Sequence, residues 1–243
     1  MAEGTASDGN ARRITLGIDT ATVVCVGLAV DGEIVATAEV DDRMAHVEQL
    51  TPLVRRVCAS AQVAPTELTE VVVGLGPGPY TGLRVGIITA RVLAEVAGAR
   101  LRGVCTLDVI AAQHVAGSRP AAPPAGGGRR PPGHGPAGEF VVATDARRRE
   151  VYWARYAAGG TRLAGPAVAA PADVAGLPTL GPGADLYPEV LNVADGPRAL
   201  DPATLARVGP TLPDAGTQPL YLRRPDATEP GRRKSVLVRG ARR

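Results

Sequence analysis

Apolar positions are densest near the start of the chain, where they form three consecutive runs. Residues 14–20, 23–30 and 33–40 carry these runs over lengths typical of β-strands. Asp31 and Gly32 separate the last two runs and have the composition of a hairpin turn. The pattern therefore predicts three strands, of which the second and third form an antiparallel hairpin.

Helical spacing of apolar residues follows directly. Residues 45–61 show it first, with Pro52 inside the segment, where it is expected to kink the helix. The remaining order is described by alternating short apolar runs and helical segments: a strand at 71–75, a glycine-rich turn at 74–82, a helix at 81–97, a strand at 101–105 and a helix at 106–115.

This order of elements predicts an α/β fold. Antiparallel strands followed by strand–helix–strand units match the ribonuclease-H-like half of actin-type (ASKHA) folds, and we expect two unequal lobes. The predicted boundaries are a disordered N-terminus at 1–12, an N-terminal lobe at 13–116, a Gly/Pro/Arg-rich linker or insertion at 117–138, a smaller C-terminal lobe at 139–224 and a basic tail at 225–243.

Charge is concentrated at the C-terminal end. The formal net charge is +3, while residues 225–243 hold six basic and two acidic residues, so the remaining 224 residues sum to −1. The alkaline isoelectric point therefore reflects the tail and does not by itself argue for a nucleic-acid-binding fold. Contact between the tail and RNA phosphates is a hypothesis, and a solvated tail without partners is its alternative.

Cysteine usage and hydropathy favour a cytoplasmic protein. Cys25, Cys58 and Cys105 are far apart and show no Cys-x-x-Cys spacing, which argues against a disulfide framework. The N-terminus has no apolar run behind a basic start, so no secretory signal is expected. No uncharged apolar stretch approaches the ~20 residues needed to cross a bilayer, so we expect no membrane association.

No catalytic or metal-binding residues are predicted. His46, His114 and His134 lack the i, i+4 spacing that puts two imidazoles on one helical face, so no metal or other cofactor is expected. None of the four serines lies in a Gly-x-Ser-x-Gly elbow. Asp145 and Glu150 flank three arginines on an apparent hairpin, which favours a salt-bridged turn over an acid/base pair.

The turns after the first strand and before the second helix are candidates for an anion or nucleotide loop. The candidate residues are Asp19, Gly76, Gly78, Thr81 and Gly82. Backbone N–H groups at a helix start can hold an anion, but Pro77 and Pro79 each remove a donor. The alternative, which we prefer, is structural: Asp19 and Thr20 hydrogen-bond nearby backbone, and Thr81 caps the helix.

The second predicted helix is apolar nearly all round. Gly86, Ala90 and Ala94 form a flank of small side chains that would let another helix approach closely. The pattern leaves two occupants open, a partner protein or the first helix of the same chain.

Three segments together resemble the TsaB family: residues 14–22 (ITLGIDTAT), 74–86 (GLGPGPYTGLRVG) and 145–153 (DARRREVYW). Residues 219–223 (PLYLR) are a fourth, weaker match. The family loop usually reads Pro-Gly-Ser-Phe-Thr-Gly, whereas this chain has Pro79 and Tyr80 at the Ser and Phe positions. The missing hydroxyl at position 79 weakens phosphate binding by a side chain.

This resemblance implies an actin-like pseudo-enzyme. It would pair with the catalytic paralogue TsaD and, with the ATPase TsaE, support threonylcarbamoyl transfer onto the adenosine next to the anticodon, contacting tRNA only indirectly. A homodimer is the implied alternative for the isolated chain. The implied partner interface lies on the first two helices, at His46, Leu50, Val54, Arg84, Gly86, Ala90 and Ala94.

Two other functions stay open. An active actin-like small-molecule kinase fits the fold, but no glycine follows Asp19 and no second phosphate loop is recognisable. A peptidase-type hydrolase is disfavoured because the metal ligands and the nucleophile elbow are missing.

Overall fold

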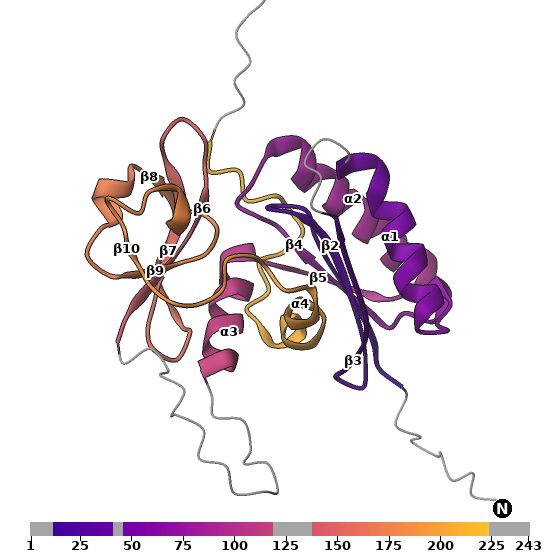
Figure 1. Ribbon diagram of the computed structural model, residues 1–243. Coiled ribbons are helices and arrows are strands. Elements are labelled where there is room, and N and C mark those ends of the chain that lie inside the picture. The colour runs from indigo at the N-terminus through magenta and orange to yellow at the C-terminus, as the bar shows by residue number, and fades with distance from the viewer. Residues whose placement is uncertain (1–11, 41–45, 119–137, 224–243) are drawn as a thin grey trace, which may run out of the picture.

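Two β-sheets lie side by side, with helices on the outside of the first sheet and between the two (Figure 1). The structure is a computed structural model that describes residues 12–40, 46–118 and 138–223. Nearly all of the predicted disordered N-terminus (1–12), linker (117–138) and basic tail (225–243) lies outside these ranges, but residues 117 and 118 of the predicted linker are helical. Within the described ranges, no helix is long and apolar enough to span a bilayer.

The first sheet follows the predicted order closely. Its strands are β1 (Ile14–Asp19), β2 (Val24–Val30), β3 (Glu33–Val40), β4 (Glu70–Gly74) and β5 (Arg100–Val104). They are arranged β3-β2-β1-β4-β5, antiparallel across the hairpin strands and parallel from β1 to β5. The mixed pairing arises because a hairpin reverses the chain, whereas the helical crossovers return it to the same direction.

Helices lie on both faces of this sheet. α1 (His46–Ser60) and α2 (Tyr80–Ala97) lie together on its outer face. The short α4 (Pro202–Val208) packs on its inner face, and α3 (Thr106–Ser118) lies between the two sheets, against α4 and strands of the second sheet (Figure 1). α1 continues through the exposed Pro52 as one helix. Its apolar face fills the core because Leu50, Val54 and Val57 follow helical spacing.

The second sheet repeats the strand order of the first. Its strands are β6 (Phe140–Asp145), β7 (Val151–Tyr156), β8 (Arg162–Ala169), β9 (Pro178–Leu180) and β10 (Asn192–Val193). Their order, β8-β7-β6-β9-β10, corresponds to β3-β2-β1-β4-β5. Short 3₁₀ turns, Pro171–Val174 and Ala184–Leu186, stand where the first lobe has long helices. This repeated arrangement is the actin-like α/β fold that the sequence predicts.

A shared hydrophobic core joins the two sheets. It combines Val72 and Ile110 from the first half of the chain with Phe140, Tyr156 and Leu180 from the second. α4 packs on β1 and β2 although it follows the second sheet in sequence. The predicted lobe at 139–224 therefore includes a helix that lies against the first sheet, and the division into lobes stays a proposal.

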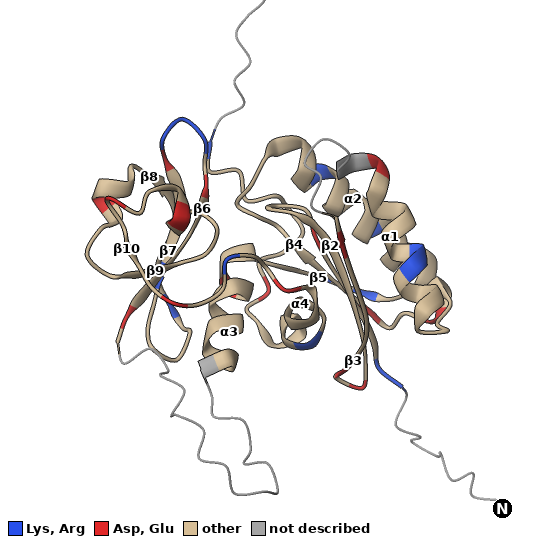
Figure 2. Cartoon of the chain, viewed as in Figure 1, with Lys and Arg blue, Asp and Glu red and all other residues tan. Residues whose placement is uncertain are grey.

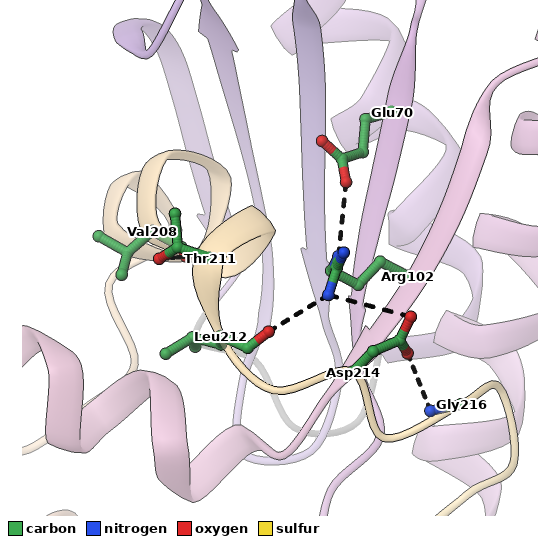
Figure 3. Close-up of polar contacts among 7 residues, drawn as sticks. All are labelled: Glu70, Arg102, Val208, Thr211, Leu212, Asp214 and Gly216. Atoms are coloured by element: carbon green, nitrogen blue, oxygen red, sulfur yellow. Dashed lines mark hydrogen bonds and ion pairs between the residues drawn. The ribbon is translucent and has the colours of Figure 1, made fainter. Parts of the chain in front are cut away.

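The end of the described chain forms a C-terminal strap (residues 212–223) along the edge of the first sheet. Ala215 N donates to Gly103 O at 2.8 Å, and Leu220 N donates to Leu75 O at 2.8 Å. Figure 3 shows Arg102 of β5 reaching both the sheet and the strap. Its guanidinium donates to Leu212 O at 3.2 Å and lies 3.5 Å from a Glu70 carboxylate oxygen. The strap thus covers an edge strand that would otherwise offer unpaired backbone groups.

Candidate functional site

Asp19 ends β1 inside a sealed junction of the first lobe. Its side chain is fully buried and accepts hydrogen bonds from Ala21 N at 2.7 Å and from the Thr106 hydroxyl at 2.6 Å. A Cβ on Gly74 would lie 1.7 Å from the carboxylate, so glycine is needed there. Burial raises the pKa of Asp19 to about 6, although hydrogen bonds to Thr106, Ala21 and Thr22 lower it. The carboxylate therefore stabilises the turn after β1 by accepting these hydrogen bonds.

Close packing explains the glycines that precede and begin α2. A Cβ on Gly78 would lie 2.8 Å from Ala21 O, and one on Gly86 would lie 2.3 Å from the Thr20 hydroxyl. The Thr20 hydroxyl also donates to Gly82 O at 2.8 Å. Asp19, Gly76, Gly78 and Gly82 are thus brought together around one interlocked turn. Anion binding by this loop stays a prediction.

The predicted helix cap is wrong. α2 begins at Tyr80 with Pro79 in the cap position, and no side chain accepts a hydrogen bond there. Thr81 lies one residue inside the helix and is exposed. Pro79 takes the extended conformation that a cap position requires, which fixes the helix start without a hydroxyl.

A cleft of about 410 Å³ separates the two lobes. It is lined by the turn after β1, by Pro79 and by the second lobe, namely Ala21, Thr22, Val23, Thr144, Asp145, Arg147, Pro182, Leu186, Arg198 and Ala199. Its charged groups pair with neighbours: Arg147 with Asp145 at 3.2 Å, and Arg198 with Asp185 at 2.9 Å. The hydroxyls of Thr22 and Thr144 are buried and have no hydrogen-bond partner among the described residues.

The outer face of α2 carries an exposed apolar stripe. Ile88, Val92 and Val96 recur every four residues and are 59%, 55% and 64% exposed. Arg84 and Arg91 lie exposed on the same helix. An apolar row of this kind on a helix surface is unusual for a face that meets only water.

Most residues of the predicted partner interface are buried within the chain. Leu50, Val54, Ala90 and Ala94 are 1%, 3%, 0% and 4% exposed and belong to the core of the first lobe. Gly86 is also buried, against Thr20. The prediction that these side chains form an open surface is therefore wrong, because the small flank of α2 faces its own sheet and α1. Arg84 is exposed, and the side chain of His46 is outside the described part of the chain.

Comparison with known proteins identifies the family. The family model for TsaD, tRNA N6-adenosine threonylcarbamoyltransferase, matches residues 41–194. The chain belongs to this family. Within it the chain is TsaB/YeaZ-like, as its relatives and structural neighbours indicate.

Among the relatives, uncharacterized proteins of Mycobacterium leprae and Mycobacterium tuberculosis are 40% and 39% identical. The alignments cover 88% and 87% of this chain, and 56% and 92% of those proteins. The tRNA threonylcarbamoyladenosine biosynthesis protein TsaB of Escherichia coli is 35% identical over 58% of this chain and 54% of its own length. The structure of YeaZ from Pseudomonas aeruginosa superimposes with a TM-score of 0.63 at 25% identity, covering 86% of this chain and 100% of YeaZ.

The segments that carry the TsaB resemblance meet at one end of the molecule. The rings of Tyr80 and Tyr221 stack with centroids 4.5 Å apart, and Arg84 Nε donates to the Tyr221 hydroxyl at 2.9 Å. Arg223 pairs with Glu150 on the β6–β7 turn. The start of α2, the β6–β7 turn and the strap are thus in contact, although they are far apart in sequence.

Sequence reasoning missed Tyr80, Tyr221 and Arg223 as surface residues that act together. The sequence feature that could have identified them is residues 219–223 (PLYLR), which resemble the TsaB family but had no role assigned to them. Among residues 12–40, 46–118 and 138–223, no group of three or more His, Cys, Asp or Glu side chains could hold a metal ion.

Proposed function

We propose that this chain is a TsaB-type scaffold in the biosynthesis of threonylcarbamoyladenosine in tRNA. Membership of the TsaD family and 35% identity to E. coli TsaB support this role. The catalytic paralogue TsaD would be its partner, and the ATPase TsaE would join the pair in the cytoplasm. The chain itself would carry no catalytic residue and no cofactor.

The observation that carries the proposal is the apolar stripe of Ile88, Val92 and Val96 on α2. Three β-branched side chains more than half exposed would each gain from removal from water, by about 25 cal/mol per Å² of apolar surface. Arg91, which is exposed beside them, would contribute to the polar rim that such interfaces have. In isolation, a second copy of the chain is the alternative occupant of the same stripe.

The role of Asp19 supports a non-catalytic subunit. In an active actin-like phosphotransferase, the acidic residue at the end of the first strand would face the nucleotide's metal. Here both carboxylate oxygens of Asp19 are engaged by Ala21 and Thr106, and the group is fully buried. A small-molecule kinase is the second candidate, favoured only by the interlobe cleft of about 410 Å³. Sub-micromolar ATP binding by the isolated chain would support the kinase and contradict the scaffold.

The test is assembly with TsaD. Val92→Glu places a charge in the middle of the stripe, and we expect it to weaken binding of TsaD at least tenfold, since each 1.4 kcal/mol is a factor of ten. Val35→Glu is the matched control, because Val35 is 45% exposed on the edge strand β3, which β2 and β1 separate from β4, the strand on which α2 packs. Calorimetric titration of both variants and the native chain gives the affinities. Equal affinity of all three would overturn the proposed interface.

Function is tested separately with purified TsaD, TsaE, ATP, an activated threonylcarbamoyl donor and a tRNA transcript. We expect threonylcarbamoyladenosine to form only when this chain is present. Formation at the same rate without it would overturn the proposed function. Sedimentation of the isolated chain shows whether Val92→Glu also dissociates a homodimer.

A further inference from the structure

Three consecutive arginines form the tight turn between β6 and β7. Arg147, Arg148 and Arg149 all have positive φ, at 60°, 55° and 61°, and all are exposed. Left-handed backbone is uncommon for residues other than glycine, and runs of three such residues are rarer still. Figure 2 shows this turn as a continuous basic segment at one end of the molecule.

Two more arginines contact segments that border this turn. Arg223 of the strap pairs with Glu150 at the end of the turn, and Arg84 of α2 donates to the hydroxyl of Tyr221 on the strap. A hollow of about 190 Å³ joins the segments. Its lining includes Tyr80, Arg147, Arg148, Tyr152, Tyr221 and Arg223.

The charge of this region is strongly positive. We call Arg84, Arg147, Arg148, Arg149 and Arg223 the arginine surface. Arg147 pairs with Asp145, and Arg223 pairs with Glu150, so two of these five arginines have a carboxylate partner on the same turn. The described chain ends at Arg223, and the sequence after it, residues 224–243, holds seven basic and two acidic residues.

Aromatic rings border the arginines. Tyr80 and Tyr221 are stacked and are 37% and 38% exposed. The Arg84 guanidinium lies 3.9 Å from the centre of the Tyr80 ring. Guanidinium groups bind phosphate with a planar fork of donors, and exposed aromatic rings stack on unpaired bases. The two features together fit RNA better than an acidic protein, which offers no bases to stack.

We propose that the arginine surface binds the phosphate backbone of RNA directly, with Tyr221 beside an unpaired base. The identity of that RNA as tRNA rests on the proposed function. This differs from the sequence-based expectation that tRNA is contacted only indirectly through the complex. The chain would then contribute binding energy to substrate capture as well as a scaffold for its partner.

The experiment uses the full chain assembled with TsaD and an unmodified tRNA transcript. Arg148→Asn with Arg149→Asn removes two charges, and asparagine tolerates the left-handed backbone of the turn. Arg100→Gln with Arg207→Gln is the control, because both arginines are exposed on other parts of the first lobe. Tm values of each chain confirm equal folding.

We expect the salt dependence of tRNA affinity to change. The slope of log K against log salt should become shallower by about 1.4 to 1.8, since each lost phosphate contact removes about 0.7 to 0.9. The control variant should keep the native slope. Arg148→Lys with Arg149→Lys should restore most of it, since charge dominates this effect.

Three results would overturn the proposal. They are an unchanged slope in the asparagine variant, an equal loss in the control variant, and binding of polyglutamate with the same sensitivity to the substitutions. The same preparations report on the proposed function independently. If the native chain binds TsaD and supports tRNA modification but the asparagine variant keeps the native slope, only the proposal of an RNA-binding surface is wrong. If the native chain supports no modification, the proposed function fails whatever the slope.

Discussion

The first strands of the two lobes end in the same way but lead to different surroundings. β1 and β6 are both six residues long, both are flanked by an antiparallel and a parallel neighbour, and both end in aspartate. Asp19 accepts a hydrogen bond from Ala21 N at 2.7 Å, and Asp145 accepts one from Arg147 N at 2.7 Å. The two aspartates therefore form equivalent turns at equivalent places.

Asp19 and Asp145 differ in how deeply they are buried. Asp19 is covered by Gly74 and Thr106, whereas the side chain of Asp145 is 26% exposed, lines the interlobe cleft and pairs with Arg147. Long helices cover the first lobe, and only short turns stand in their place in the second. The strand order sets where each aspartate lies, and the covering elements decide whether it holds the fold or faces solvent.

The largest expected effect concerns the core that the lobes share. Phe140 is 1% exposed, stacks on Tyr156 with ring centroids 5.5 Å apart and meets the His114 ring edge-on at 5.0 Å. Phe140→Ala should lower the free energy of unfolding by about 3–5 kcal/mol. Because this core includes residues of both halves, the loss should appear in one transition. Urea unfolding, followed by circular dichroism and by Trp153 fluorescence, measures it.

Leu16→Ala is the counterpart in the first core. Leu16 is fully buried, and its truncation should cost about 2–5 kcal/mol. Trp153 is the only tryptophan and lies on β7 of the second sheet. If the two lobes unfold together, Leu16→Ala should also lower the urea midpoint of the Trp153 fluorescence transition. A fluorescence midpoint unaffected by Leu16→Ala would mean that the lobes unfold independently.

The next effect sharpens the comparison of the two aspartates. The pKa of Asp19 in the folded chain is about 6, above the value of 3.8 for an unperturbed aspartate. The folded state therefore binds the proton more tightly, and this stabilisation is full below pH 3.8 and is lost as pH rises through 6. Asp19→Asn should gain stability relative to the native chain by roughly 2 kcal/mol between pH 4 and pH 7, which is most of the roughly 3 kcal/mol that the whole shift represents at 1.36 kcal/mol per unit of pKa. Urea unfolding at each pH gives the difference.

Asp145→Asn is the control for this pH profile. Asp145 forms the same turn but is partly exposed and ion-paired, so its replacement should leave no comparable rise in relative stability over this range. Parallel profiles for Asp19→Asn and the native chain would show that the burial of Asp19 does not perturb its protonation.

Periodicity predicted the first lobe well because its elements alternate clearly between apolar and polar positions. Residues 14–20 and 101–105 become β1 and β5 with shifts of one residue at their ends. In the second lobe, the hairpin around Asp145 and Glu150 was predicted and forms between β6 and β7, but β8 was not predicted. Its sequence places Gly165 and Pro166 in mid-strand, which breaks both alternation and β propensity. Asp201 before Pro202 is a helix-start signal that marks α4, and its carboxylate caps Ala203 and Thr204.

The candidate surfaces were harder to predict because sequence spacing does not say which side of a helix faces inward. Ala90 and Val92 both lie on a helix that is apolar nearly all round, yet Ala90 is fully buried and Val92 is 55% exposed. The salt-bridged turn was predicted from Asp145, Glu150 and the arginines between them. Asp145 does pair with Arg147, whereas Glu150 pairs with Arg223, a contact between distant segments that only the tertiary fold creates.

A smaller effect compares the two faces of α2. Ala90 packs in the first core, so Ala90→Leu should overfill it and lower the free energy of unfolding of the isolated chain by about 1–3 kcal/mol. Val92→Leu adds bulk on the exposed face and should change stability by no more than about 0.5 kcal/mol. Thermal unfolding of both variants tests this. A fully stable Ala90→Leu chain that fails to bind TsaD would reinstate the small flank as the interface.

The smallest effect concerns the two ends of the strap. Asp214 lies 3.9 Å from Arg102 with 47% of its side chain exposed, and Glu150 pairs with Arg223 with 38% exposed. Exposed ion pairs typically contribute about 0–1 kcal/mol because water screens them. The strap is also held by backbone hydrogen bonds to Gly103 and Leu75, which the substitutions leave in place. Asp214→Asn and Glu150→Gln should each therefore lower the free energy of unfolding by less than about 1 kcal/mol, and by less still in high salt. Urea titrations at two salt concentrations measure both values. A loss above 2 kcal/mol for either variant would mean that the ion pair, rather than the backbone, fastens that end of the strap.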